Sequence, residues 1–318
     1  MSTKMRGNFL LAITALVWGI SFVSQSIGMD YIGANTFNGI RTLLGGLVLL
    51  PVILITDAGK KKKGTYKKCN FKKLLLYGAV CGVLLCVAST LQSLGLKETT
   101  AGKSGFITAL YIIFVSVMGI FAGRKLNLKI VSGVLLAVLG MYFLCLFGAE
   151  INFCFGDFLT FLCAIVFSFH ILVIDRVAPK TDGVKLACTQ FFVCGLLNCI
   201  AMFLFESPDW ALIKQCIGAI LYSGIMSCGV AYTLQIVGQK GVNPTVASLI
   251  LSLESSISVL AGWAILGQQL SSREILGCVL MFGAIILAQI PVGEKKRILA
   301  LAAKGRREQA VDNTENLG

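Results

Sequence analysis

Charged residues are scarce in this chain. Asp, Glu, Lys and Arg make up 14% of the 318 residues, and hydrophobic residues make up 56%. A soluble domain of this length carries about 25% charged residues. The composition therefore excludes an ordinary soluble protein and predicts a polytopic membrane protein with no soluble domain of notable size.

Histidine is nearly absent, since His170 stands alone, and the twelve cysteines include no CxxC. A zinc site is thus not expected. The motifs HExxH, GxSxG and GxxxxGK[ST] are also missing, so neither a hydrolase nor an ATP-driven pump is indicated. With one histidine and few membrane acids, no pair of nucleophile and base can be assembled. We expect no enzyme, no cofactor and no metal.

Long apolar runs dominate the chain instead. A bilayer-spanning helix needs about 20 residues, and ten runs come near that length. They cover about 9–27, 36–55, 74–94, 104–122, 130–147, 158–174, 186–205, 217–237, 245–266 and 275–290. The first run is too long for a signal peptide and lacks a cleavage site, so it is predicted to stay as a helix. The fold class is therefore an all-α integral membrane protein of ten helices.

The basic residues predict the orientation of these helices. With the amino terminus inside, 23 Lys and Arg fall on inner segments and four on outer ones. Lys and Arg translocate poorly, so this bias predicts that both termini are cytoplasmic. The net charge of +13 then reports topology rather than nucleic-acid binding. The lysines at 60–73 serve as a topology anchor or bind anionic lipid.

Cys154 and Cys216 both fall in predicted outer loops, and whether they pair stays open.

The sequence repeats itself in two halves. TLQSLGLK at 90–97 matches TLQIVGQK at 233–240, so Lys97 corresponds to Lys240. GNFLLAITALV at 7–17 aligns with GDFLTFLCAIV at 156–166, and GRKLNLKIVSG at 123–133 with GQQLSSREILG at 267–277. Because each half has five spans, the second half is inserted upside down. Inverted repeats are typical of secondary transporters, whose substrate site lies near the midplane. The predicted units are 1–149, 150–292 and a basic cytoplasmic tail at 293–318.

Three short motifs carry a resemblance to a known family. They are Val17-Trp18-Gly19, Gly39-Ile40-Arg41 and Leu253-Glu254-Ser255. With the paired links before Gly133 and Gly277, they resemble the drug/metabolite transporter superfamily, specifically proteins with two EamA domains. The resemblance implies a basket of ten helices that exports or takes up small metabolites without ATP. The chain departs from the family pattern at Ser255, where proline is common, and at Arg124 and Gln268, where glutamate is common. Any gating or interface role of those glutamates is in doubt here.

Glu254 is the first candidate functional residue. A carboxylate at the centre of a membrane helix costs about 2.5–3.5 kcal/mol on insertion scales, so it faces a cavity or a partner. It could couple transport to protons or pair with a substrate ammonium. Alternatively, it is a structural acid bonded to serine or tyrosine of a neighbouring helix.

Two further ionisable residues are candidates. Arg41 lies about 8 Å below the outer surface at 1.5 Å per residue. It could bind a substrate carboxylate or phosphate, snorkel outward, or pair with Glu254. His170, in the sixth span, could relay protons, although a packed, satisfied histidine explains it equally.

Matched amides and four aromatic residues complete the set. Gln92 and Gln235 are repeat equivalents, and Gln190 aligns with Arg41. Amides in a membrane need partners, so they line the pathway or tie helices together. The candidate aromatics, which could stack on a planar substrate or anchor the helices, are Trp18, Tyr111, Tyr232 and Trp263.

The sequence thus predicts a secondary transporter in the cytoplasmic membrane that moves a small metabolite, amino-acid-like or related, by alternating access. Export is favoured through the family resemblance alone. The partners are a small-molecule substrate, the bilayer and, as a coupling ion, the proton. The alternatives are an uncoupled facilitator and a non-transport membrane protein. The substrate, the direction and the oligomeric state are not given by the sequence.

Overall fold

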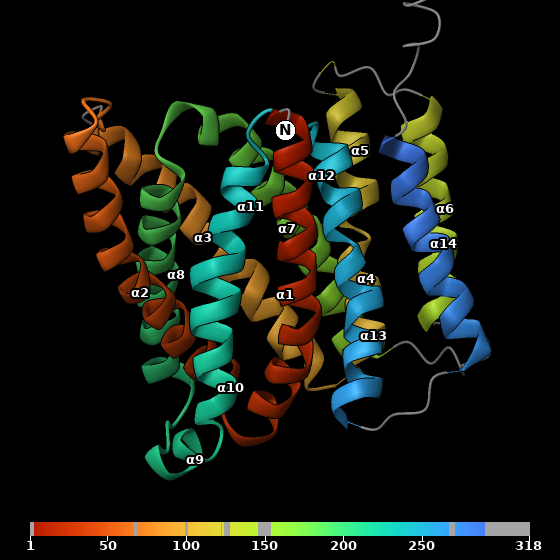
Figure 1. The fold of residues 1–318 in the computed structure, drawn as a ribbon. Helices are drawn as coiled ribbons and strands as arrows, with labels where there is room; N and C mark the ends of the chain where they lie inside the picture. Colours follow the sequence, from red (N-terminus) through yellow and green to blue (C-terminus); the bar gives the residue numbers. More distant parts are fainter. Residues whose placement is uncertain are drawn as a thin grey trace, which may run out of the picture.

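The computed structural model describes residues 3–66, 69–98, 101–121, 123, 128–145, 154–266 and 271–289. Every regular element in these ranges is a helix, and the helices lie roughly side by side in one bundle (Figure 1). The elements of the first half are α1 (Thr3–Tyr31), α2 (Ala34–Lys62), α3 (Phe71–Leu96), α4 (Ala101–Ala109), α5 (Tyr111–Phe121) and α6 (Leu128–Cys145). Those of the second half are α7 (Phe155–Val177), η1 (Ala178–Lys180), α8 (Gly183–Phe205), α9 (Trp210–Gln215), α10 (Ile217–Leu221), η2 (Tyr222–Tyr232), α11 (Thr233–Gly238), α12 (Pro244–Leu251), α13 (Leu253–Leu266) and α14 (Ser272–Gln289).

Within the described ranges, eight helical stretches are long and apolar enough to cross a membrane. They correspond to the first four and the sixth to ninth predicted runs. The fifth run contains a shorter apolar helix, Ile130–Phe143, within α6. The tenth run forms α14, which begins at Ser272, three residues before the predicted run. α6 and α14 pack against each other at one edge of the bundle (Figure 1).

Two predicted spans are broken near their middle. The run 104–122 divides at Leu110 into α4 and α5, and the run 245–266 divides at Ser252 into α12 and α13. The two breaks are 142 residues apart, so they occupy nearly the same place in the two repeats. A break at membrane depth is tolerated where the backbone is buried in protein or lines a cavity. Tyr111 and Glu254 follow the breaks and face such a cavity.

The third irregular span, 217–237, is one continuous rod built of α10, η2 and α11, of which η2 is a π-helix of eleven residues. The wider π turn is frequently found at functional sites.

Cys216, just before this rod, is a buried free thiol, and Cys154 is also free. Their predicted loops therefore hold no disulfide between them.

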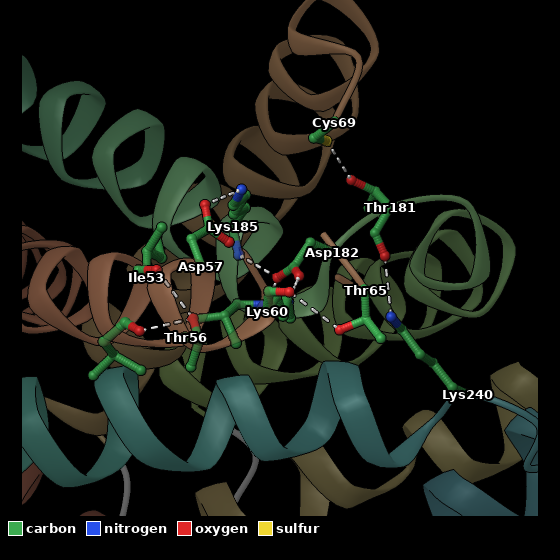
Figure 2. Close-up of polar contacts among 12 residues, drawn as sticks. Ile53, Thr56, Asp57, Lys60, Thr65, Cys69, Thr181, Asp182, Lys185 and Lys240 are labelled. Atoms are coloured by element: carbon green, nitrogen blue, oxygen red, sulfur yellow. Dashed lines mark hydrogen bonds and ion pairs between the residues drawn. The ribbon is translucent and has the colours of Figure 1, made fainter. Parts of the chain in front are cut away.

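Helices α2 and α8 pack along each other and are joined at both ends. At the end where α1 begins, Lys60 Nζ lies 2.5 Å from Asp182 Oδ2, and Lys185 Nζ lies 2.6 Å from Asp57 Oδ2 (Figure 2). At the opposite end, the Glu206 carboxylate accepts hydrogen bonds of 2.7–3.0 Å from the backbone N–H groups and side chains of two residues, Asn35 and Thr36. Glu206 thus caps the first turn of α2 from the other half of the chain.

The Lys185–Asp57 ion pair and the contact of Thr36 with Glu206 are repeat copies of each other. Thr36 and Lys185 are 149 residues apart, and so are Asp57 and Glu206. The same offset of 149 residues relates the aligned segments 7–17 and 156–166. One contact of the inverted repeat therefore occurs once at each end of the bundle. The copies differ at the N-cap: α8 has Asp182, whose carboxylate accepts the N–H groups of its own first turn. α2 has Gly33, which has no side chain to do so.

Gly33→Ala is expected to destabilise the protein. A Cβ at Gly33 would overlap the Glu206 carboxylate, which must then leave the helix end. Loss of a helix cap costs about 0.5–2 kcal/mol. Gly59→Ala is the matched control in the same helix, because nothing lies within 4 Å of its added Cβ. Thermal unfolding in detergent should show a lower melting temperature for Gly33→Ala than for wild type and no decrease for Gly59→Ala. Equal melting temperatures of the two variants would contradict the capping role.

Candidate functional site

A narrow central cavity lies between the helices. Its walls come from α1, α2, α3, α5, α7, η2, α11 and α13, that is, from both halves of the chain. The lining residues are Trp18, Phe22, Gln25, Arg41, Gln92, Tyr111, Phe167, Ile171, Ser227, Tyr232, Gln235 and Glu254. Seven of the ten residues named from the sequence are among them.

Most of the wall is built from repeat equivalents. Eight of the twelve lining residues form four pairs with an offset of 149 or 143 residues, the offsets of the sequence anchors. The pairs are Trp18 with Phe167, Phe22 with Ile171, Gln92 with Gln235, and Tyr111 with Glu254. The cavity therefore lies where the two repeats meet, as expected for the site of an inverted-repeat transporter.

Glu254 is buried in this wall, with 5% of its surface exposed. Tyr111 Oη donates a hydrogen bond to Glu254 Oε1 at 3.1 Å. It is the one hydrogen bond that the described residues give this carboxylate. The structural interpretation, an acid held by a tyrosine, thus has a contact to support it. Because the same carboxylate lines the cavity, the contact does not exclude a functional one.

Arg41 is a buried cation without an acidic partner among the described residues. Its side chain is 3% exposed, and Nε donates to Asn38 Oδ1 at 2.9 Å. The guanidinium carbon lies 5.3 Å from the centre of the Phe37 ring. Within the described ranges no carboxylate comes within 4 Å of it, so it neither pairs with Glu254 nor reaches solvent. A buried guanidinium that keeps unused donors on a cavity is suited to an anionic group.

Two neutral groups in the wall are also unpartnered. Trp18 Nε1 and Gln235 Oε1 are buried and have no hydrogen-bond partner among the described residues. The Trp18 and Tyr232 rings lie 4.5 Å apart between centroids, which makes one side of the cavity aromatic. Buried polar groups are normally satisfied, so an unfilled donor and acceptor on a cavity favour a polar ligand there. Gln92 has a partner, since its Nε2 lies 3.3 Å from Thr108 Oγ1.

Three predicted residues lie away from the cavity. His170 and Gln190 are fully buried, and His170 Nε2 lies 3.3 Å from Gln190 Oε1. The His170 ring is 6.3 Å from the Tyr232 ring, so the pair sits behind the wall. Trp263 is 54% exposed on α13 and does not face the cavity.

Five lining residues were not named from the sequence: Phe22, Gln25, Phe167, Ile171 and Ser227. The repeat offset could have found Phe167, because it is the equivalent of Trp18. Gln25 lies about two helical turns after Trp18, so it could have been found as a polar residue on the same helix face. Ser227 lies in the π-helix, where ordinary helical spacing does not apply. Arg124, Gln268 and the tail after Gly293 lie outside the described residues.

Comparison with known proteins agrees with this architecture. The EamA-like transporter family matches the chain twice, over residues 5–146 and 154–289. The chain belongs to the EamA-like transporter family. An uncharacterized transporter of Archaeoglobus fulgidus is 29% identical to it over 283 residues, covering 89% of this chain and 85% of the relative. YoaV of Bacillus subtilis, also named an uncharacterized transporter, is 21% identical to this chain, and the match covers 90% of this chain and 97% of YoaV.

A crystal structure of another protein has the same fold as this EamA-family chain. The two superpose with a TM-score of 0.70 over 88% of this chain and 96% of the other, at 17% sequence identity. The family is one of transporters, so this protein is a multi-pass membrane transporter.

Proposed function

We propose that this protein is a secondary transporter that carries an amino-acid-like metabolite through the central cavity. The observation that carries the proposal is that a guanidinium and a carboxyl group line the same cavity without pairing with each other. Among the described residues Arg41 has no acid beside it, and Glu254 has only the hydrogen bond of Tyr111. Placing two ionisable groups inside a membrane and keeping them apart is costly unless a ligand or an ion meets them.

A zwitterion suits this arrangement. The Arg41 guanidinium offers a fork of donors to a carboxylate, and Glu254 offers an acceptor to an ammonium group. The apolar part of the ligand would lie against Trp18, Tyr232 and Phe167, which line the same cavity. Trp18 Nε1 and Gln235 Oε1 supply one further donor and one acceptor.

The membrane arrangement completes the proposal. The ten predicted helices, with 23 basic residues on inner segments and four on outer ones, support a topology with both termini in the cytoplasm. α1 then begins at the inner face and ends at the outer face (Figure 1). The cytoplasmic membrane is the proposed location, and export is favoured because the resemblance to EamA proteins favours it. The two five-helix halves would open the cavity to one face at a time.

Purified protein tests this function directly. Thermal unfolding against a panel of amino acids should identify solutes that stabilise the protein, since a ligand that binds only the folded state raises the melting temperature. A solute found in this way should be moved into or out of liposomes that contain the protein. Flux that stops at equal concentrations, whatever the pH gradient, would indicate a facilitator. Absence of flux for every stabilising solute would contradict transport.

A further inference from the structure

The inverted repeat allows each contact to be compared with its own copy. In a transporter whose halves exchange conformations, a contact made by both copies cannot distinguish the two states. The contact of Thr36 with Glu206 and that of Lys185 with Asp57 are such a pair, since each joins α2 to α8. A contact that only one repeat makes is different. When the two repeats exchange conformations, that contact must break and the equivalent contact in the other repeat must form.

Lys240 makes a contact of this second kind. Its Nζ donates to the carbonyl oxygen of Thr181 at 3.0 Å (Figure 2). Lys240 follows α11, and Thr181 lies just before Asp182, the N-cap of α8. The contact therefore joins two links at the inner face. Burial lowers the pKa of Lys240, and the charge of Asp182 opposes that shift, as expected for an ammonium group held against the protein.

The copy of this contact is not made. Lys97 and Ile32 are the repeat equivalents of Lys240 and Thr181, and they belong to the opposite face of the bundle. Both line an outer pocket, together with Met29 and Glu206. The Lys97 side chain is exposed, and its ammonium group makes no hydrogen bond or ion pair within the described part of the chain. The two links that touch at the inner face are thus separated by a hollow at the outer one.

We propose that Lys240 and Lys97 are alternating latches of the two faces. In the state described here, Lys240 holds the inner links together at the Thr181 carbonyl. In the other state, Lys97 closes the outer pocket by donating to the Ile32 carbonyl, and Lys240 releases Thr181. This inference rests on the proposed alternating access. It goes beyond the cavity, because neither lysine lines it.

Cysteine labelling tests the latches without a substrate. Met29→Cys reports on the outer pocket, which Met29 lines, and Gln239→Cys reports on the inner face, where Gln239 is 2% exposed. Trp210→Cys on α9 is the control, because Trp210 is 76% exposed and does not line the pocket. Each probe is combined with Lys240→Met or Lys97→Met in purified protein in nanodiscs. Labelling by a charged maleimide is then read peptide by peptide, which separates the introduced cysteine from the natural ones.

Opposite changes at the two probes are expected. A hydrogen bond to a charged group shifts a two-state equilibrium by about tenfold or more. Lys240→Met should therefore slow labelling of Met29→Cys at least about twofold and speed that of Gln239→Cys. Lys97→Met should leave both rates as they are or change them in the opposite sense, and Trp210→Cys should not respond. Parallel changes at both probes, or no change with Lys240→Met, would overturn the latches. Absence of transport with these opposite changes intact would count against the proposed function instead.

Discussion

Arg41→Met is expected to weaken binding of carboxylate-bearing solutes strongly without destabilising the unliganded protein. The reason is that Arg41 gains little from its surroundings. Nε donates to Asn38, and the guanidinium lies over Phe37, but no described carboxylate neutralises the charge. A buried charge without a partner costs free energy, so a methionine of similar length should keep or raise the melting temperature.

The loss of affinity should be large. Removing one partner of a buried, charge-assisted hydrogen bond costs about 2–5 kcal/mol, or about 30-fold in affinity and more. Titration of a stabilising amino acid, read by thermal unfolding or calorimetry, measures this loss. Amines that lack the carboxylate should bind wild type and Arg41→Met equally poorly.

Two control variants separate binding from packing. Arg41→Lys keeps the charge but not the planar fork, so it should bind with intermediate affinity. Gln190 is the repeat equivalent of Arg41 and lies behind the cavity wall, so Gln190→Met should bind as wild type does. A destabilised Arg41→Met that still binds its solute with full affinity would show that Arg41 is a packing residue.

The sequence predicts the charged residues of the cavity for a clear physical reason. Charge inside an apolar run is so costly that Glu254 and Arg41 stand out without any structure. The repeat adds more, since the offset of 143 residues relates Gln92 to Gln235 from the sequence alone. The same offset could also have related Tyr111 to Glu254. That Tyr111 and Glu254 bond to each other requires the fold, because only the inverted packing of the halves brings equivalent positions together.

Other features could not be predicted because hydropathy does not distinguish them. Leu110 lies in an unbroken apolar run with no proline beside it, so nothing in its surroundings indicates the end of α4. Trp263 satisfies the same criteria as Trp18, but a tryptophan is equally stable against lipid. Glu206 looks like an ordinary loop acid, and its partners on α2 are 170 and 171 residues away. Their contact depends on the three-dimensional meeting of α2 and α8.

The second large effect concerns Glu254→Gln. Glutamine has nearly the same shape and can still accept the hydrogen bond of Tyr111, but it cannot release or bind a proton. If Glu254 carries the coupling proton, accumulation of solute in liposomes under an imposed pH gradient should fall about tenfold or more, to the level without a gradient. Exchange of labelled for unlabelled solute needs no net proton movement, so a substantial part of it should remain.

Tyr111→Phe is the matched variant for this test. It removes the hydrogen bond and leaves the acid, so solute should still accumulate in response to the pH gradient, with a changed rate. Loss of both activities in Glu254→Gln with normal unfolding would assign Glu254 to the ligand rather than to coupling. Accumulation in Glu254→Gln at the wild-type level would sink proton coupling through this residue. The Tyr111–Glu254 contact would then be the structural bond that joins equivalent points of the two halves, and the energy for uphill transport would have to enter elsewhere.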